Sequence, residues 1–296
     1  MIAPPTQVRR VVYLGTPALA VRPLEALVEA GFGVALVVTA PDKRRGRGSD
    51  VTPSPVKAAA TELGIPVAHD VADVLDVGAD LGVGVASGKL ISTEVLDELA
   101  MVNLHFSLLP SWRGAAPVER AILAGDPRTG VCLMEVAPEL DSGGVYRSSE
   151  VTIGDKTLEE LRSELVEVGA ALLVEALTSG LGDPAPQVGE VSYASKIDPA
   201  ELELLWDRPA VELERVVRLE GAYTSFRGDR LKIWSVALDS RTDLEPGEMD
   251  GVVVGTGRGA LELIEVQAAG KPRRRASDWA NGARLASQDR LGGERS

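Results

Sequence analysis

The chain has 296 residues, of which 45% are hydrophobic, so a globular protein with room for two domains is expected rather than a disordered chain. A formal net charge of −13 argues against a protein that coats nucleic acid through bulk charge. The single cysteine, Cys132, excludes an internal disulfide framework. With no signal peptide and no run of about 20 apolar residues, a cytoplasmic protein without a membrane partner is expected.

Strands and helices alternate in the first part of the chain. Apolar runs predict strands, and amphipathic stretches predict helices, the second of which begins where Ser54 and Pro55 supply a cap and a first-turn proline. The expected strands are 10–14, 34–39, 81–86, 101–105 and 131–136, and the expected helices are 18–30, 54–64, 94–99, 117–124 and 157–177. This alternation predicts an α/β domain with a mostly parallel sheet, whose ligands bind beyond the carboxyl ends of the strands.

The composition of the chain changes after residue 177. Glycine and proline are frequent in residues 179–189, which predicts a linker. A helix is expected at 209–219, and short strands are expected at 231–238, 251–254 and 261–266. Short strands at this spacing predict a small β-barrel. We therefore expect an N-terminal domain of residues 1–182, a linker of residues 183–206 and a C-terminal domain of residues 207–296.

Three polar residues suggest chemistry at the mouth of the sheet. His105 ends an apolar strand, and Asn103, two residues earlier, points to the same side. Asp141 precedes a Ser-Gly-Gly turn after the next strand and could orient the imidazole. A histidine to move protons and an amide to donate to an oxyanion would suit direct acyl transfer to an amine. A purely structural, hydrogen-bonded histidine fits the local pattern equally well.

Other candidate sites are weaker. His69 is expected to be structural, and Cys132 to be a small core residue. No cluster of His, Cys and carboxylates has the spacing of a metal site, and no G-x-G-x-x-G motif supports nicotinamide binding. Two basic patches, residues 43–47 and 271–275, could grip nucleic acid, although both also fit solvated loops.

Asn103–Val131, NLHFSLLPSWRGAAPVERAILAGDPRTGV, closely resembles the signature of the methionyl-tRNA formyltransferase family. The resemblance covers nearly the whole chain in order: VVYLGTPALA at residue 11, VVTAPDKRRGRG at 37, SPVKAAA at 54 and GAYTSFRGDRLKIW at 221. It implies a Rossmann-like formyltransferase domain followed by a small OB-like β-barrel. The implied reaction transfers the formyl group of 10-formyltetrahydrofolate, without a metal, to the amino group of methionine on initiator tRNA.

The resemblance also assigns site residues. It implies that Asn103, His105 and Asp141 are catalytic. It implies folate binding by Ser107, Leu108, Leu109, Pro110, Gly88 and Leu90, and tRNA binding by Lys43, Arg44, Arg45, Arg47 and Lys271. A monomer is expected.

The chain departs from the family pattern at Ser87, Ser92, Ser111 and Gly144, where the family has tyrosine, proline, arginine and aspartate. Three alternatives stay open at this point. The acceptor could be a small amine, such as glycinamide ribonucleotide or an amino sugar. Water could replace the amine, giving a formyltetrahydrofolate hydrolase. The protein could also be a non-catalytic module that binds folate or tRNA.

Overall fold

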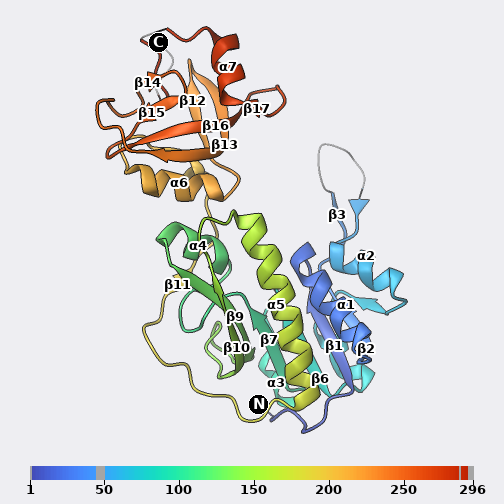
Figure 1. The fold of residues 1–296 in the computed structure, drawn as a ribbon. Coiled ribbons are helices and arrows are strands. Elements are labelled where there is room, and N and C mark those ends of the chain that lie inside the picture. Colours follow the sequence, from blue (N-terminus) through green and yellow to red (C-terminus); the bar gives the residue numbers. More distant parts are fainter. Residues whose placement is uncertain (1, 45–50, 287, 293–296) are drawn as a thin grey trace. The chain divides into compact units, whose positions relative to one another are not determined.

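The computed structural model describes residues 2–44, 51–286 and 288–292. These residues form two compact units, which Figure 1 shows as a ribbon. The first unit holds the chain up to residue 195, except for the short segments 121–126 and 155–160. The second unit holds these two segments and the chain from residue 196 onward. No helix in the described ranges is long and apolar enough to cross a membrane.

A seven-stranded sheet forms the centre of the first unit, in the order β10-β9-β7-β6-β1-β2-β5. Its strands are β1 (Arg10–Gly15), β2 (Gly33–Val38), β5 (Val67–Ala68), β6 (Leu81–Val85), β7 (Met101–His105), β9 (Arg128–Glu135) and β10 (Val145–Thr152). Five of them, β1, β2, β5, β6 and β7, run parallel, which confirms the mostly parallel sheet expected from the sequence. The carboxyl ends of these five strands therefore meet at one edge.

Helices pack on both faces of this sheet. They include α1 (Val21–Glu29), α2 (Pro55–Glu62), α3 (Thr93–Glu98) and α5 (Leu158–Ser179), with 3₁₀ turns η1 (Ala18–Ala20) and η2 (Ala72–Val77). A further helix, α4 (Pro117–Ala124), lies between β8 (Arg113–Gly114) and β9 in the chain. Met101 belongs to a buried cluster with Val95 and Leu96 of α3. Leu104 instead contacts Gly169 of α5, where a Cβ would come within 2.9 Å of it. Because side chains alternate along a strand, Asn103 and His105 project on the face that Met101 shares with α3.

The strand expected at 131–136 is present, and the structure gives its direction. It forms β9, which runs antiparallel to β7 and pairs His105 with Cys132 and Val102 with Glu135. β10, which the sequence analysis missed, pairs antiparallel with β9. The end of β9 therefore lies about 10 Å along β7 from His105, at about 3.3 Å per residue. The loop of residues 136–144 must fold back over this distance to bring Asp141 to the histidine.

The second unit contains an antiparallel sheet in the order β12-β13-β16-β15-β14, with β17 paired to β16. Its elements are η3 (Pro199–Leu202), α6 (Ala210–Arg218), β12 (Tyr223–Phe226), β13 (Asp229–Asp239), β14 (Met249–Asp250), β15 (Val253–Gly255), β16 (Ala260–Ala268), β17 (Arg274–Arg275) and α7 (Ala276–Ala283). Isolated bridges join Leu291 to Phe226 and Arg290 to Glu248, so the end of the chain links the two edges of the sheet. This linkage gives the antiparallel domain its barrel-like closure.

Candidate active site

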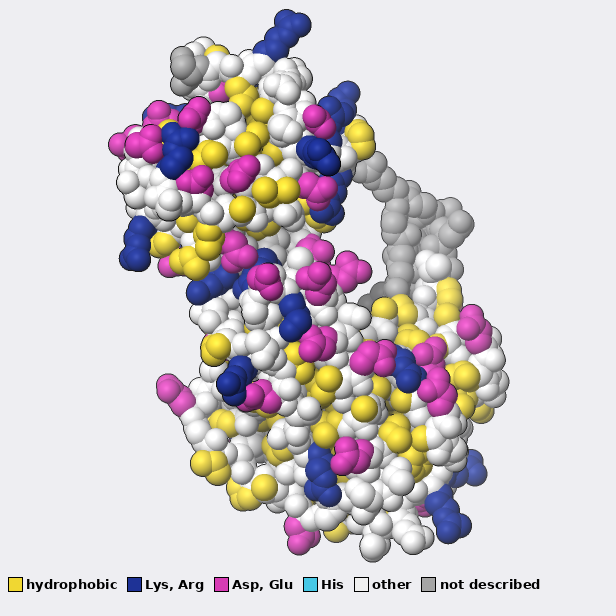
Figure 2. All heavy atoms as spheres, in the orientation of Figure 1, with side chains coloured by type: hydrophobic (Ala, Val, Ile, Leu, Met, Phe, Trp, Pro, Cys, Tyr) yellow, Lys and Arg dark blue, Asp and Glu magenta, His cyan; other side chains and the backbone are white. Residues whose placement is uncertain are grey.

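His105 ends β7 at the mouth of the parallel strands and is almost fully buried, with 5% of its surface exposed. No histidine is visible on the face of the molecule in Figure 2, where acidic and basic side chains are interspersed. Asn103 lies beside Gly84 of β6, its partner in the sheet. A Cβ at Gly84 would come within 3.1 Å of Asn103 Oδ1, so the glycine leaves room for this amide. Within the described residues the Asn103 side chain has no hydrogen-bond partner, and its N–H groups stay available to a ligand.

Two oxygen atoms face the imidazole of His105. Its Nε2 lies 2.9 Å from the carbonyl oxygen of Trp112, and its Nδ1 lies 3.5 Å from Asp141 Oδ2. Because a carbonyl oxygen only accepts hydrogen bonds, Nε2 must carry a proton and donate it. The Nδ1 of the neutral ring then holds a lone pair beside the carboxylate.

The carboxylate of Asp141 is fixed by the main chain. Its Oδ2 accepts a hydrogen bond of 2.8 Å from the backbone N–H of Gly114, in β8 (Arg113–Gly114). Asp141 itself has a left-handed backbone conformation, with φ of 48°. Gly143 follows with no space for a side chain, because a Cβ there would clash with the carbonyl oxygen of Glu135. The folded-back loop is therefore held at both its carboxylate and its tight turn.

The segment Ser107–Pro110, expected to bind folate, follows His105 directly. The buried hydroxyl of Ser107 donates to the carbonyl of Ser111, and the Leu109–Pro110 peptide is cis. Leu108 packs against Gly130 of β9. These residues form an ordered turn at the mouth of the sheet, next to His105.

Gly88 and Leu90, also expected to bind folate, lie in the loop after β6. Leu90 is 92% exposed, so its side chain is an apolar group without a packing partner in the described structure. Lys89 donates to the carbonyl of His69 and anchors the loop to the end of β5. The hydroxyl of Ser87 accepts from the Lys89 N–H. The loop is thus ordered by local polar contacts and leaves Leu90 free to meet a ligand.

The residues expected to bind tRNA fall into two groups. Lys43 and Arg44 form β3 (Lys43–Arg44), which pairs antiparallel with β4 (Val51–Thr52) as a short hairpin. Arg45 and Arg47 lie outside the described residues. At the base of this hairpin Lys57 forms a 2.7 Å ion pair with Asp42.

Lys271 belongs to the second unit, on a basic and aromatic surface of the barrel. β13 turns Leu231 and Ile233 into the core, so Arg230, Lys232 and Trp234 alternate onto the opposite face. Trp234 donates to Gln267, whose amide in turn donates to the carbonyl of Lys271. We call this surface the barrel face and define it as Tyr223, Arg230, Lys232, Trp234, Lys271 and Arg273.

Cation–π contacts organise the barrel face. Arg230 lies 3.6 Å from the ring centroid of Tyr223, and Arg273 lies 4.9 Å from that of Trp234. Lys232 lies 5.3 Å from the Trp234 ring. Aromatic rings interleaved with cations are the pattern with which barrels of this type bind nucleic-acid strands.

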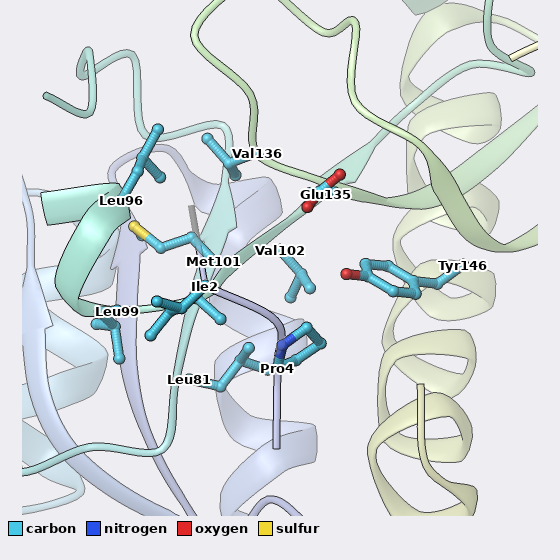
Figure 3. A pocket seen from close by; sticks show the side chains of 11 residues that line it. Ile2, Pro4, Leu81, Leu96, Leu99, Met101, Val102, Glu135, Val136 and Tyr146 are labelled. Carbon is cyan, nitrogen blue, oxygen red and sulfur yellow. The ribbon is translucent and has the colours of Figure 1, made fainter. Parts of the chain in front are cut away.

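The remaining candidates of the sequence lie outside the His105 site or inside the core. Burial raises the pKa of the Cys132 thiol, so this cysteine is not a thiolate nucleophile at neutral pH. His69 Nδ1 lies 3.0 Å from the carbonyl oxygen of Thr39, and its structural role stays a prediction. The pocket in Figure 3 is lined by residues such as Leu81, Met101 and Tyr146, lies at the opposite end of the strands and has room for about one water molecule. The described residues contain no group of three metal-ligating side chains.

Several contacts of the site could not be found from sequence. The Trp112 carbonyl and the Gly114 N–H are main-chain groups, which carry no side-chain signal. Gln187 also reaches the site, donating to the carbonyls of Asp141 and Gly143 from a stretch that the sequence marks only as a linker. The sequence offers one weak signal for Gln187. It is a polar side chain that can both donate and accept hydrogen bonds, in a stretch otherwise rich in proline and glycine.

Comparison with known proteins gives the family. The formyl transferase model matches residues 9–177, and the model of the formyl transferase C-terminal domain matches residues 196–284. The methionyl-tRNA formyltransferase of Symbiobacterium thermophilum is 42% identical over 300 residues, covering 92% of this chain and 92% of that protein. The methionyl-tRNA formyltransferase of Streptomyces coelicolor is 42% identical over 308 residues, covering 96% of this chain and 99% of that protein.

Solved structures share the fold at lower identity. The N-formyltransferase of Helicobacter canadensis, in complex with folinic acid and dTDP-3-aminofucose, has a TM-score of 0.64 at 15% identity and covers 90% of this chain and 100% of that chain. HypX from Aquifex aeolicus, in complex with tetrahydrofolic acid, has a TM-score of 0.62 at 18% identity and covers 93% of this chain and 47% of that chain. The fold agrees with the family models and the full-length relatives, and the chain belongs to the methionyl-tRNA formyltransferase family.

Proposed function

We propose that this protein transfers the formyl group of 10-formyltetrahydrofolate to the amino group of methionyl-initiator tRNA, with Asn103, His105 and Asp141 as its catalytic residues. One observation supports these roles above all. A buried histidine lies between the Trp112 carbonyl and the Asp141 carboxylate, beside an amide with free donors. Relatives about 40% identical over nearly the full chain carry the name of this activity. The monomeric state and the cytoplasmic location remain predictions from the sequence.

His105 acts as the proton acceptor through Nδ1. The neutral methionyl amine attacks the formyl carbon, and the new C–N bond leaves the amine with a proton to lose. Nε2 is already occupied by the Trp112 carbonyl, so Nδ1 is the ring atom with a free lone pair. The imidazolium that forms faces Asp141 Oδ2 at 3.5 Å and is stabilised by this negative charge.

Asn103 acts on the oxygen of the formyl group. As the amine attacks, the carbonyl oxygen becomes negatively charged, and an amide N–H can donate to it. Such a donor typically contributes about 10²–10³ in rate. The tetrahedral intermediate then breaks the bond between the formyl carbon and the folate nitrogen. That nitrogen takes the proton that His105 accepted from the amine, which restores the neutral imidazole, and the products are the formylated amine and tetrahydrofolate.

The turn at Ser107–Pro110 and the loop of Gly88 and Leu90 bind the folate. Both follow the ends of neighbouring parallel strands, β7 and β6, where ligands of such sheets bind. The exposed Leu90 side chain offers apolar surface to an aromatic ring system. These residues would therefore deliver the formyl carbon beside His105.

The barrel face and the basic hairpin bind tRNA. The net charge of −13 makes local cations necessary, because the protein as a whole repels phosphate. On the barrel face, Arg230, Lys232 and Lys271 would contact phosphates, and Trp234 would stack on a base or pack on ribose. Lys43 and Arg44 of the hairpin would add further phosphate contacts, and so would Arg45 and Arg47, which follow them in the sequence.

The test of the acceptor is a formyl-transfer assay. The acceptors are methionyl-initiator tRNA, uncharged tRNA, glycinamide ribonucleotide and an amino sugar, with hydrolysis of 10-formyltetrahydrofolate measured alongside. We expect transfer to charged tRNA alone, falling steeply with added salt. Preference for a small acceptor, or release of formate without transfer, would overturn the proposal.

The test of the barrel face compares Lys232→Ala with Arg290→Ala, which removes a cation of the second unit outside that face. Loss of one phosphate contact should lower the slope of log binding constant against log salt by about 0.9. We expect this change for Lys232→Ala only. Equal slopes for the two variants would remove the barrel face from the tRNA interface. Replacing Arg45 and Arg47 by alanine should likewise weaken tRNA use, and any slow background hydrolysis of 10-formyltetrahydrofolate, which needs no tRNA, should stay unchanged.

A further inference from the structure

The stretch after α5 is bound to the first unit instead of hanging free. Figure 1 shows it in yellow, running past the sheet to β11 (Tyr193–Ala194), which pairs with β8. Ala185 exchanges backbone hydrogen bonds with Val145 at the start of β10. Residues 185–194 therefore run alongside the two loops next to His105, the loop that follows β7 and the loop that follows β9. They also lead directly into the main segment of the second unit, which begins at residue 196.

Gln187 uses its whole side-chain amide on these loops. Its Nε2 donates to the carbonyl oxygens of Asp141 and Gly143, at 2.8 Å each. Its Oε1 accepts from Nε and Nη2 of Arg113, at 3.1 Å and 2.6 Å. Because one end faces two acceptors and the other faces a guanidinium, only one orientation of the amide fits. Gln187 therefore ties the Asp141 turn to the strand whose Gly114 N–H holds the Asp141 carboxylate.

Both residues that face His105 have strained backbones. Trp112, whose carbonyl meets Nε2, has φ of 62°, and Asp141 has φ of 48°. Left-handed conformations of this kind cost about 1–3 kcal/mol and persist only where surrounding contacts hold them. The same stretch of chain supplies such a contact to each: Ser192 Oγ accepts from the Trp112 N–H at 2.9 Å, and Gln187 donates to the Asp141 carbonyl.

We propose that Gln187 is a positioning residue of the active site, which holds the Asp141 carboxylate in register with His105. The proposal rests on the catalytic roles proposed above for His105 and Asp141. Gln187 touches neither the imidazole nor the reacting atoms in this geometry. It acts through the turn, because its two donors fix the carbonyls on either side of Ser142. Gln187 belongs to the last stretch of the first unit, so residues that the sequence marks only as a linker gain a positioning role at the active site.

The test uses Gln187→Glu and Gln187→Leu. Glutamate keeps the size of the side chain and the oxygen that accepts from Arg113. Its second carboxylate oxygen replaces the N–H donors, however, and would face the carbonyl oxygens of Asp141 and Gly143, with which it cannot hydrogen-bond. Leucine removes both sets of contacts. A displacement of about 1 Å at a catalytic group can cost about 100-fold in rate, so we expect each variant to lower kcat by roughly 10- to 100-fold. The KM for 10-formyltetrahydrofolate should stay within about twofold, since the folate residues lie on other loops.

Val188→Ala is the matched control, because the neighbouring Val188 side chain is 87% exposed and contributes no contact to the turn. It should keep wild-type kcat. Thermal unfolding of all variants separates a local effect from loss of the fold. If Gln187 only anchored the chain to Arg113, the glutamate variant would keep its turnover while the leucine variant lost stability, and the proposal would be overturned.

A double-mutant cycle with Asp141→Asn decides whether Gln187 acts through Asp141. In the Asp141→Asn background, Gln187→Glu should lower kcat by less than about threefold, because the group it positions has already lost its charge. If the double variant instead showed the product of the two single-variant losses in kcat, the two residues would act independently and the proposal would be overturned. Normal turnover of Gln187→Glu together with impaired Asp141→Asn would overturn the Gln187 proposal alone. Normal turnover of Asp141→Asn would overturn the catalytic assignment and the Gln187 proposal together.

Discussion

Replacing Asp141 by asparagine removes one charge from the proposed site and little else. The amide of the Asp141→Asn variant would still present an oxygen to the Gly114 N–H, from which Asp141 Oδ2 now accepts at 2.8 Å. Asparagine also tolerates the left-handed backbone of this position better than alanine does. The substitution therefore separates the electrostatic role of the carboxylate from its role in holding the loop.

The expected size of the effect follows from one distance. A full imidazolium and a carboxylate at 3.5 Å attract each other by about 5 kcal/mol at an effective dielectric constant of about 20. If about half of the proton has reached His105 in the transition state, about 2 kcal/mol of this attraction is lost in the variant. At about 1.4 kcal/mol per factor of ten, kcat should fall by roughly 30-fold.

The assay is single-turnover formyl transfer to methionyl-initiator tRNA at saturating 10-formyltetrahydrofolate. We expect the rate constant to fall between about 10- and 100-fold, with an unchanged melting temperature and an unchanged KM for the folate. Asp141→Ala should fall at least as far and also lose stability, because it leaves the Gly114 N–H without its acceptor. A rate within twofold of wild type for Asp141→Asn would refute the electrostatic argument, since the charge would then contribute nothing to the transition state.

Three further predictions concern the loops and the sheet. Ser54→Ala should lower the free energy of unfolding by about 1–2 kcal/mol in urea titrations, because Ser54 Oγ caps α2 through the Lys57 N–H; an unchanged midpoint would contradict this. Gly143→Ala should abolish most formyl transfer, because its Cβ would meet the Glu135 carbonyl, whereas Gly282→Ala, which has open space, should stay active. Burial and nearby carboxylates raise the pKa of Tyr146 to about 12, so its stabilising contribution is complete below pH 10.0 and is lost as pH rises toward 12. Between pH 10.0 and 12, the free energy of unfolding should fall less steeply for Tyr146→Phe than for the wild type. If the two proteins lost stability equally over this pH range, the raised pKa of Tyr146 would be disproved.

Periodicity and capping predicted most of the regular elements of the first unit. The strand at Met101–His105 and the helix beginning after Ser54 follow from apolar runs and a serine–proline start, and the structure confirms both. β10 was missed because its pattern mixes exposed Arg147 and Ser148 with buried Val151 at one edge of the sheet. In the second unit, β12 and α7 were missed because a four-residue strand and a helix containing Gly282 carry little periodic signal.

The sequence by itself determined the ingredients of the site. Asn103 and His105 share one side of a strand because alternate side chains of any strand do so, and the ordered motifs identified the family. Asp141 could be suggested only as a candidate, since direction and loop path are not encoded in local periodicity. The prediction of a mostly parallel sheet left the direction of β9 open, and its antiparallel course leaves its end away from His105.

The tertiary structure decided how these groups meet. It brought the Asp141 carboxylate to His105 through a folded-back loop, assigned the Nε2 proton through the Trp112 carbonyl, and added Gln187 from a stretch without regular structure. These contacts join residues far apart in the chain, and several use main-chain atoms that every residue possesses. The sequence gives the chemistry of each side chain, but the positions of main-chain donors and acceptors are set only when the chain has folded and packed.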